Sequence, residues 1–211
     1  MKIVYAGNNK SKLRQIRSVL SDFEVLSLED CGIDVDVEET GKTFEQNAYL
    51  KASVISKLVD YVVVSDDSGL CIDALDGYPG VHTKRFLGDN VSNQERVNFL
   101  IEKMKDVKDE DRTCHYVCCI CVMDKNQNHN FFAFENVGKV AKLSIGENTF
   151  GFFDLFELAD GRTFAQMTES EQLKISARAK ALESAKEYIE KLCLQNKRDI
   201  VKNLKNKFSE K

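Results

Sequence analysis

The sequence has no tryptophan, one proline and no long apolar run. The single proline, Pro79, excludes collagen-like and proline-rich linker architectures. The longest apolar runs, residues 61–64 and 116–123, are far short of the ~20 residues that a membrane-spanning helix needs, so we expect no membrane partner. The apolar stretch after Lys2 ends at Ala6 and is too short for the apolar region of a secretory signal, so we expect no such signal and a cytoplasmic location.

The chain also has no excess of positive charge. It contains 30 lysines and arginines and 34 aspartates and glutamates, so its net charge is −4. Binding to duplex nucleic acids requires clustered positive charge, so we expect no nucleic-acid partner. The exception is residues 196–211, where six basic and two acidic residues give +4 and leave −8 for residues 1–195. We therefore expect one domain at residues 1–195 and a separate basic tail at residues 196–211.

The tail has its own pattern. Ile200, Leu204 and Phe208 recur every four residues, which is typical of a short amphipathic helix. Such a helix could bind a protein partner, whereas a frayed C-terminal end is the alternative interpretation.

Cysteines are numerous by comparison, with seven in a chain that is 43% hydrophobic. Without an export signal, reduced thiols are the simplest interpretation. Cys114, Cys118, Cys119 and Cys121 could suggest a metal site, but they lack paired C-x-x-C spacing. Alternate side chains of a strand point to opposite faces, so we predict that this segment is a buried strand.

Apolar periodicity predicts alternating strands and helices. Strands are expected at residues 2–6, 24–28 and 60–64, and helices after residue 12, at 44–58, at 93–104 and from Thr168 to at least Leu194. Residues 113–145 favour a hairpin or meander with a turn at residues 124–130. This order of elements indicates an α/β or α+β fold.

Three segments carry residues suited to phosphate or metal chemistry. The first is a turn in which exposed backbone N–H groups and two lysines precede a helix and suit a polyphosphate. Ordinary helix capping explains the same composition. The turn consists of Gly7, Asn8, Asn9, Lys10, Ser11 and Lys12.

The second segment joins Glu38 and Glu39 to the helix that follows them. Thr43 can cap that helix, and the helix dipole alone favours acidic residues before it. The functional interpretation places a carboxylate at Mg²⁺ and aims Lys51 at phosphate, with Asn47 on the same helix face as Lys51.

The third segment is Asp66-Asp67-Ser68-Gly69, directly after an apolar strand. Open α/β folds commonly bind ligands at the carboxyl ends of strands. Two adjacent carboxylates repel each other unless a cation or a shared proton compensates, so the pair suits a Mg²⁺ site or a general base. An acidic turn between a strand and a loop explains the same residues equally well.

Taken in order, these segments resemble the inosine triphosphate pyrophosphatase family, which includes dITP/XTP pyrophosphatases. The family motifs A-T-x-N-x-x-K, E-E-T-G-x-T-F-x-x-N-A-x-x-K-A and D-D-S-G-L-x-V-D-A-L-x-G-x-P-G-V correspond to residues 6–12, 38–52 and 66–81. Gly7 stands where the first motif has Thr or Ser. The similarity continues to about residue 192.

The resemblance implies two α/β lobes around an elongated mixed central sheet with flanking helices, and a nucleotide cleft between the lobes. It also implies a homodimer that uses Mg²⁺ to hydrolyse nucleoside triphosphates such as dITP and XTP to monophosphate and pyrophosphate.

The resemblance further implies a role for each matching residue. Asp67 is the expected general base and holds Mg²⁺ together with Glu38 or Glu39, while Lys12 and Lys51 act on the phosphates. The other expected nucleotide contacts are the first turn (residues 7–11), Ser68, Arg85 for phosphate, and Phe150, Gly151, Phe152, Phe153, Gln172, Ala177 and Arg178 around the base.

The chain departs from the family pattern where the base is expected. In F-G-[YW]-D-P, the aspartate and the proline are replaced by Phe153 and Asp154. In E-K-N-x-x-S-H-R, the lysine, asparagine and histidine are replaced by Gln172, Leu173 and Ala177. The family's lysine and histidine help to read the 6-oxo group of the purine, so we expect altered base specificity here.

Two functions follow from these residues. The first is a Mg²⁺-dependent nucleoside triphosphate pyrophosphatase with altered or relaxed base choice. The alternative is a catalytically weak nucleotide-sensing subunit of the same fold that regulates a partner protein through the basic tail.

Overall fold

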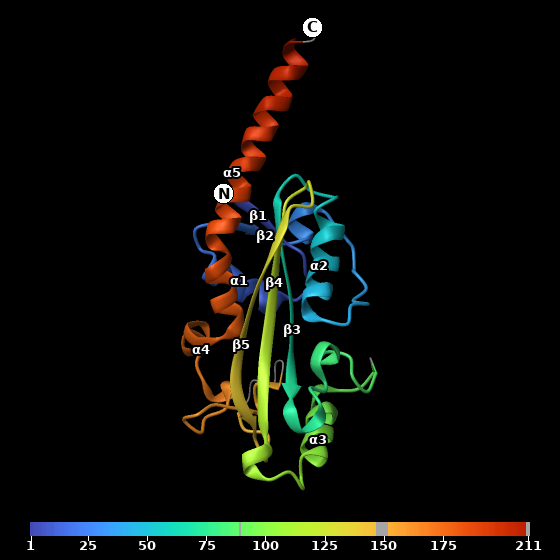
Figure 1. Ribbon diagram of the computed structural model, residues 1–211, viewed down its shortest axis with the longest axis vertical. Helices are drawn as coiled ribbons and strands as arrows, with labels where there is room; N and C mark the ends of the chain where they lie inside the picture. Colours follow the sequence, from blue (N-terminus) through green and yellow to red (C-terminus); the bar gives the residue numbers. More distant parts are fainter. Residues whose placement is uncertain (89, 147–151, 210–211) are drawn as a thin grey trace. The chain divides into compact units, whose positions relative to one another are not determined.

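The computed structural model describes residues 1–88, 90–146 and 152–209, and the surroundings of side chains up to residue 199. Its strands are β1 (Lys2–Tyr5), β2 (Glu24–Leu26), β3 (Val62–Ile72), β4 (Thr113–Met123), β5 (His129–Val140) and β6 (Phe156–Glu157). Its helices are α1 (Lys10–Val19), α2 (Phe44–Ile55), α3 (Asn93–Lys103), α4 (Glu169–Ile175) and α5 (Ala177–Ser209), as Figure 1 shows. The predicted β1, β2, α2 and α3 are confirmed, and each ends slightly earlier than expected.

The strands form one sheet in the order β2-β1-β3-β4-β5-β6. β1 is parallel to both of its neighbours, with Val4 opposite Leu26 of β2 and Val63 of β3. β5 is antiparallel to β6. The sheet is therefore mixed, which confirms the predicted α/β fold with a mixed central sheet.

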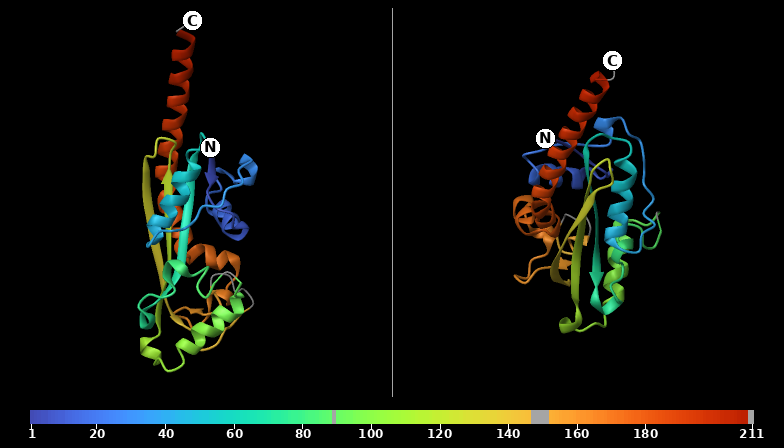
Figure 2. Two further views of the ribbon diagram at one scale, coloured as in Figure 1. Left: turned by 90° about the vertical axis from the view of Figure 1, so that its right-hand side faces the viewer. Right: turned by 45° about the horizontal axis from the view of Figure 1, so that its top comes forward.

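The chain divides into two compact units, and β3, β4 and β5 each contribute residues to both. Unit 1 comprises Met1–Asp67, Cys119–Phe132 and Ala181–Lys211, and unit 2 comprises Ser68–Cys118 and Ala133–Lys180. In unit 1, α2 packs Ala48, Ala52 and Ile55 into a core cluster with Val4 of β1 and Val63 of β3. These residues recur at i, i+4 and i+7 and so form one helix face. In both views of Figure 2, the last turns of α5 extend beyond the strands of this unit.

Unit 2 has an aromatic core. Its buried rings include Tyr116 of β4, Phe156 of β6 and, from the loops and short turns, Phe86, Phe152, Phe153 and Phe164. Arg112 is also buried and donates to the carbonyl groups of Met104, Val140 and Ala141. A buried guanidinium is tolerated there because it is hydrogen-bonded on several sides.

The predicted hairpin is confirmed. β4 and β5 are neighbours in the sheet, and the turn between them is closed by the bond from Asp124 N to Asn128 O at 3.0 Å. The Asp124 carboxylate accepts from the backbone N–H groups of Asn126 and Asn128. An aspartate that bonds its own turn in this way stabilises the reversal of the chain.

The cysteine-rich segment forms β4, as predicted, and its thiols are buried and not joined in disulfides. Burial raises the pKa of Cys121 to about 12 and also raises that of Cys114, which makes both thiols unreactive at neutral pH. Within the described residues, no group of three or more His, Cys, Asp or Glu side chains is arranged to hold a metal ion.

β3 differs from the expected strand. The sequence predicts a strand that ends at residue 64 and an acidic turn or loop after it, whereas β3 continues through Asp66 and Asp67 to Ile72. Each carboxylate has a lysine partner within unit 1, so the acidic residues do not need to leave the sheet to be solvated.

The long helix expected from Thr168 is in fact two helices, α4 and α5. Thr168 caps α4 as predicted, but Ser176 has extended backbone angles (φ −62°, ψ 142°) and interrupts the helix. The Ser176 hydroxyl accepts from the backbone N–H of Ala179 at 3.2 Å and so caps the start of α5. In the described part of the chain, no helix is both long enough and apolar enough to cross a membrane.

Candidate active site

The first predicted turn joins β1 to α1 and directs Lys12 toward β3. Asn9 caps the helix, because its Oδ1 accepts from the backbone N–H of Lys12 at 3.0 Å. The Lys12 Nζ lies 2.9 Å from Oδ2 of Asp66, and its side chain is largely buried. Asn8 and Lys10 are exposed. The turn therefore performs ordinary capping and also presents an ammonium group.

Asp66 and Asp67 have different partners, because consecutive residues of a strand point to opposite faces. Asp66 accepts from the hydroxyl of Tyr5 at 2.6 Å and pairs with Lys12. Asp67 accepts from Nδ2 of Asn47 at 2.9 Å. Both aspartates are buried. The two adjacent aspartates therefore pair with different lysines, Asp66 with Lys12 and Asp67 with Lys51.

Lys51 of α2 brings together two carboxylates. Its Nζ lies 2.5 Å from Oε1 of Glu39 and 3.8 Å from Oδ1 of Asp67. Burial raises the pKa of Asp67 above its ordinary value, and the charge of Glu39 raises it further, against the opposing effects of Lys51, Asn47 and Lys12. Glu38 is exposed, whereas Glu39 is half-buried beside Lys51.

Asn47 is held in place by a close approach to Gly41. The Gly41 N–H donates to Oδ1 of Asn47 at 2.8 Å, which leaves the amide N–H₂ to face Asp67. A Cβ at Gly41 would lie 2.6 Å from that same Oδ1. Glycine is therefore required at this position by packing. Thr43 caps α2 as predicted, by accepting from the backbone N–H of Gln46.

A cavity of about 620 Å³ opens beside the first turn. It is lined by Gly7, Asn8, Asn9 and Lys10, by α1 and by residues 27–30. Its described lining does not include Lys12, Lys51 or Asp67, so the cavity is separate from the carboxylate cluster. The buried charged groups, Lys51, Asp66 and Asp67, lie in the cluster and do not line this cavity.

In unit 2, Ser68 and Arg178 are in direct contact. The guanidinium Nη2 of the buried Arg178 donates to the Ser68 hydroxyl at 3.0 Å. Ala177 is the first residue of α5, and its backbone N–H donates to Oδ1 of Asn136 at 2.6 Å. Asn136 also donates to the carbonyl of Ile175, so it ties the junction between α4 and α5 to β5.

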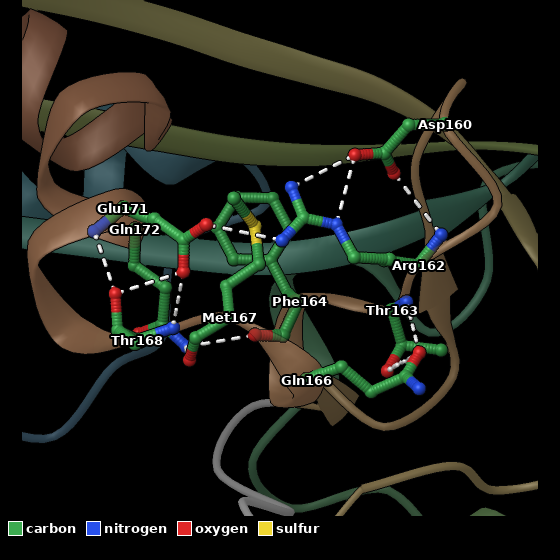
Figure 3. Close-up of polar contacts among 9 residues, drawn as sticks. All are labelled: Asp160, Arg162, Thr163, Phe164, Gln166, Met167, Thr168, Glu171 and Gln172. Atoms are coloured by element: carbon green, nitrogen blue, oxygen red, sulfur yellow. Dashed lines mark hydrogen bonds and ion pairs between the residues drawn. The ribbon is translucent and has the colours of Figure 1, made fainter.

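Gln172 is buried, and the surrounding backbone determines how its amide lies. Its Nε2 donates to the carbonyl of Phe164 at 2.8 Å and more weakly to that of Met167 at 3.4 Å (Figure 3). Two acceptors on one side identify that atom as the amide nitrogen. The donor capacity of Gln172 is therefore used within the protein.

The predicted aromatic residues of the base site lie in the core of unit 2. Phe152 packs on Phe86 with ring centroids 5.6 Å apart, and Phe153 packs on Phe164 at 5.1 Å. Both Phe152 and Phe153 are buried. Phe150 and Gly151 lie outside the described residues, and contact of these residues with a base stays a prediction.

Arg85 is half-buried and follows the short turn Gly80–His82. The loop after it is held by Arg96 of α3, whose guanidinium donates to the carbonyl groups of Phe86, Gly88 and Val91. Sequence reasoning missed Arg96 and also Tyr5. Two signals in the sequence could have identified them. Tyr5 is a tyrosine in an otherwise apolar strand, and Arg96 is an arginine among apolar positions of its helix.

The chain is similar to known proteins over most of its length. A family model described as the Ham1 family matches residues 3–188. The dITP/XTP pyrophosphatase of Clostridium perfringens is 36% identical over 195 residues, covering 88% of this chain and 96% of the relative. That of Treponema denticola is 35% identical over 196 residues, covering 90% and 98%.

Solved structures show the same similarity. The Ham1 protein of Staphylococcus aureus superposes with a TM-score of 0.81 at 32% identity, covering 90% of this chain and 98% of that one. A HAM1 protein from Coxiella burnetii gives a TM-score of 0.82 at 32% identity, covering 90% and 99%.

Proposed function

Since the chain belongs to the Ham1 family, we propose that it is an enzyme that hydrolyses dITP- and XTP-like nucleoside triphosphates to monophosphate and pyrophosphate. The observation that carries this proposal is the pair of ammonium groups, Lys12 and Lys51, held against consecutive buried aspartates. Hydrolysis of a phosphoanhydride depends mainly on positioning and charge stabilisation, which such groups supply.

We propose Mg²⁺ as the cofactor, held by Glu39 and Asp67. These two carboxylates already share one cation, the Lys51 ammonium, so the donor set and its charge fit a divalent ion. Mg²⁺ is commonly bound by one or two carboxylates together with waters and substrate phosphates, so a third protein carboxylate is not required. When bound, Mg²⁺ would lower the pKa of water and neutralise phosphate charge. The exposed Glu38 is less suited to this role.

In this proposal Asp67 is the general base. Water adds to phosphorus, its proton passes to the Asp67 carboxylate, and the bond between the α- and β-phosphates breaks, so pyrophosphate leaves with the electron pair. The raised pKa of Asp67 brings its basicity closer to neutral pH than that of an exposed aspartate. Asn47, which donates to Oδ2, would hold the carboxylate in one orientation.

The other expected contacts supply charge and orientation. Lys12, Lys51 and Arg85 would balance the charge of the triphosphate, and the backbone N–H groups of residues 7–11 would add neutral donors. Ser68 and Arg178, which are already bonded to each other, are further expected contacts of the nucleotide.

We further propose that base specificity is altered relative to the family pattern. Ala177 has no side-chain donor, and the Gln172 amide nitrogen already bonds two backbone carbonyls. The protein would then lack the donors that bond a 6-oxo group. Those donors would be left unpaired by a 6-amino group, and this is how they discriminate between the two bases. Discrimination by an unpaired polar group can be worth several kcal/mol, so losing it should broaden the range of bases accepted.

The alternative is a nucleotide-sensing subunit that binds the same ligands and turns over weakly. The observation that favours it is that α5 continues to Ser209, beyond the family match, which ends at residue 188. The basic residues of this extension would contact an acidic partner protein. We also propose a homodimer, and a cytoplasmic location because the cysteines are not joined in disulfides.

A panel assay tests the proposed function. Pyrophosphate release is measured with Mg²⁺ for ITP, dITP, XTP and the four common ribonucleoside triphosphates. The enzyme proposal requires release from at least the 6-oxopurine nucleotides, and altered specificity requires a narrow range of kcat/KM across the panel. Thermal stabilisation by nucleotide without any pyrophosphate release would contradict the enzyme and support the sensor.

A further inference from the structure

We propose that Tyr5 is a positioning residue of the phosphate site: its hydroxyl orients Asp66, which in turn holds the Lys12 ammonium. We also propose that Tyr5 is the reason for glycine at position 7. The first statement rests on the proposed function in so far as Lys12 binds phosphate. The second depends on packing alone.

The three side chains form one chain of contacts in unit 1. Tyr5 is the last residue of β1 and lies opposite Val64 of β3, two residues before Asp66. Its hydroxyl donates to Oδ1 of Asp66 at 2.6 Å, and the Lys12 Nζ lies 2.9 Å from Oδ2. Both oxygens of the carboxylate are thus engaged, by one neutral donor and one charged donor.

Burial increases the energetic contribution of these contacts. Asp66 is 1% exposed and Tyr5 is 2% exposed, so water cannot replace a lost donor without a rearrangement. A hydrogen bond to a charged group is worth more than a neutral one, particularly at a buried site. Without the Tyr5 hydroxyl, Oδ1 of Asp66 loses a donor, and the carboxylate that pairs with Lys12 is held less firmly.

Gly7 belongs to the same arrangement. A Cβ at Gly7 would lie 2.6 Å from both Cζ and Oη of Tyr5, so any side chain there must displace the phenol ring. Displacing the ring breaks its bond to Asp66. Glycine at position 7 therefore leaves the space that the Tyr5 ring occupies.

The first experiment uses Tyr5→Phe, which keeps the ring and removes the hydroxyl. We expect KM for the triphosphate to rise about tenfold, which is the effect of about 1.4 kcal/mol, while kcat stays within about twofold. The rate at which acetic anhydride acetylates Lys12, measured by mass spectrometry without nucleotide, should rise several-fold. Tyr61→Phe, the same change at a 40%-exposed tyrosine, is the matched control and should alter neither quantity.

The second experiment is a double-mutant cycle measured by urea denaturation. Gly7→Thr alone should lower the denaturation midpoint, because the new side chain meets the Tyr5 ring. In the Tyr5→Leu background the same substitution should have a much smaller effect, because the ring is absent. This non-additivity is the signature of direct contact.

The outcomes separate the two proposals. If Tyr5→Phe changes neither KM nor the acetylation of Lys12, the positioning role is wrong. If the cycle is additive, the explanation of Gly7 is wrong. If the unmodified protein releases no pyrophosphate from any nucleotide, the proposed function fails, while Lys12 acetylation and the denaturation cycle still decide this inference.

Discussion

Asp66 and Asp67 show how far environment determines the role of a residue. They are identical and adjacent, yet one bonds a tyrosine and Lys12 while the other bonds an amide and approaches Lys51. Their separation follows from strand geometry, which sends consecutive side chains to opposite faces. The charge of Glu39 acts on Asp67 and raises its pKa. This difference supports the proposal that Asp67 is the base and that Asp66 holds Lys12.

Asp67→Asn should stabilise the protein while abolishing activity. The native pKa of Asp67 lies above its unfolded value, so the native state binds the proton more tightly and loses stability as pH rises through the interval between the two values. Asparagine does not titrate and can still accept from Asn47. Urea denaturation should therefore show a gain in the free energy of unfolding that is small near pH 4 and larger at pH 7.

The same variant should release pyrophosphate at least ~10²-fold more slowly, since a general base contributes about that factor or more. Nucleotide binding should remain measurable. If the free energy of unfolding gained by Asp67→Asn instead falls between pH 4 and pH 7, burial does not raise the pKa of Asp67.

Glu39→Gln and Glu38→Gln form a matched pair for the metal. Glu39 shares the Lys51 ammonium with Asp67, whereas its neighbour Glu38 is exposed. Changes to groups that merely orient a ligand cost about 10- to 100-fold in metal affinity, so losing a ligand should raise the half-saturating Mg²⁺ concentration at least about tenfold. Glu38→Gln should leave it unchanged. If the two substitutions change the half-saturating Mg²⁺ concentration equally, Glu39 is not a metal ligand.

At the scale of elements, α4 shows how helix capping places a side chain. The Thr168 hydroxyl accepts from the backbone N–H of Glu171, and the Glu171 carboxylate accepts from the backbone N–H of Thr168 (Figure 3). Arg162 also donates to Glu171. These bonds, chiefly those from Thr168, lower the pKa of Glu171 to about 2. The capping box fixes the first turn of the helix that carries Gln172.

Thr168→Ala should lower the free energy of unfolding by about 1 kcal/mol at neutral pH, the usual cost of losing a helix cap. Glu171 stabilises the fold above its ordinary pKa, and this contribution disappears as pH falls toward 2. The deficit of the variant should therefore narrow below about pH 4.5. Ser170→Ala, at an exposed position of the same helix, is the control and should stay within about 0.5 kcal/mol.

At the scale of the whole molecule, the family match and the chain have different extents. The match ends at residue 188, while α5 continues to Ser209 and carries the basic tail. The carboxylate cluster is formed entirely by residues 5–67, so the chemistry proposed for unit 1 does not require the tail.

Deleting residues 200–211 should therefore leave kcat and KM for pyrophosphate release within about twofold. The deletion should also abolish co-purification of any partner that binds the tail. A large loss of kcat in a variant with unchanged thermal stability would show that the tail takes part in catalysis.

The amino-acid sequence by itself determined the fold class, the strands β1 and β2, the helices α2 and α3 and the core strand of cysteines. Apolar periodicity, turn composition and motif spacing are local properties, and these features depend on them. Only the tertiary structure decided that the aspartates lie inside β3, that Glu39 and not Glu38 faces Lys51, and that Gln172 donates to backbone carbonyls. It also decided that Tyr5 meets Asp66. These outcomes depend on which strand faces reach which helices, and contacts between residues distant in sequence set that geometry.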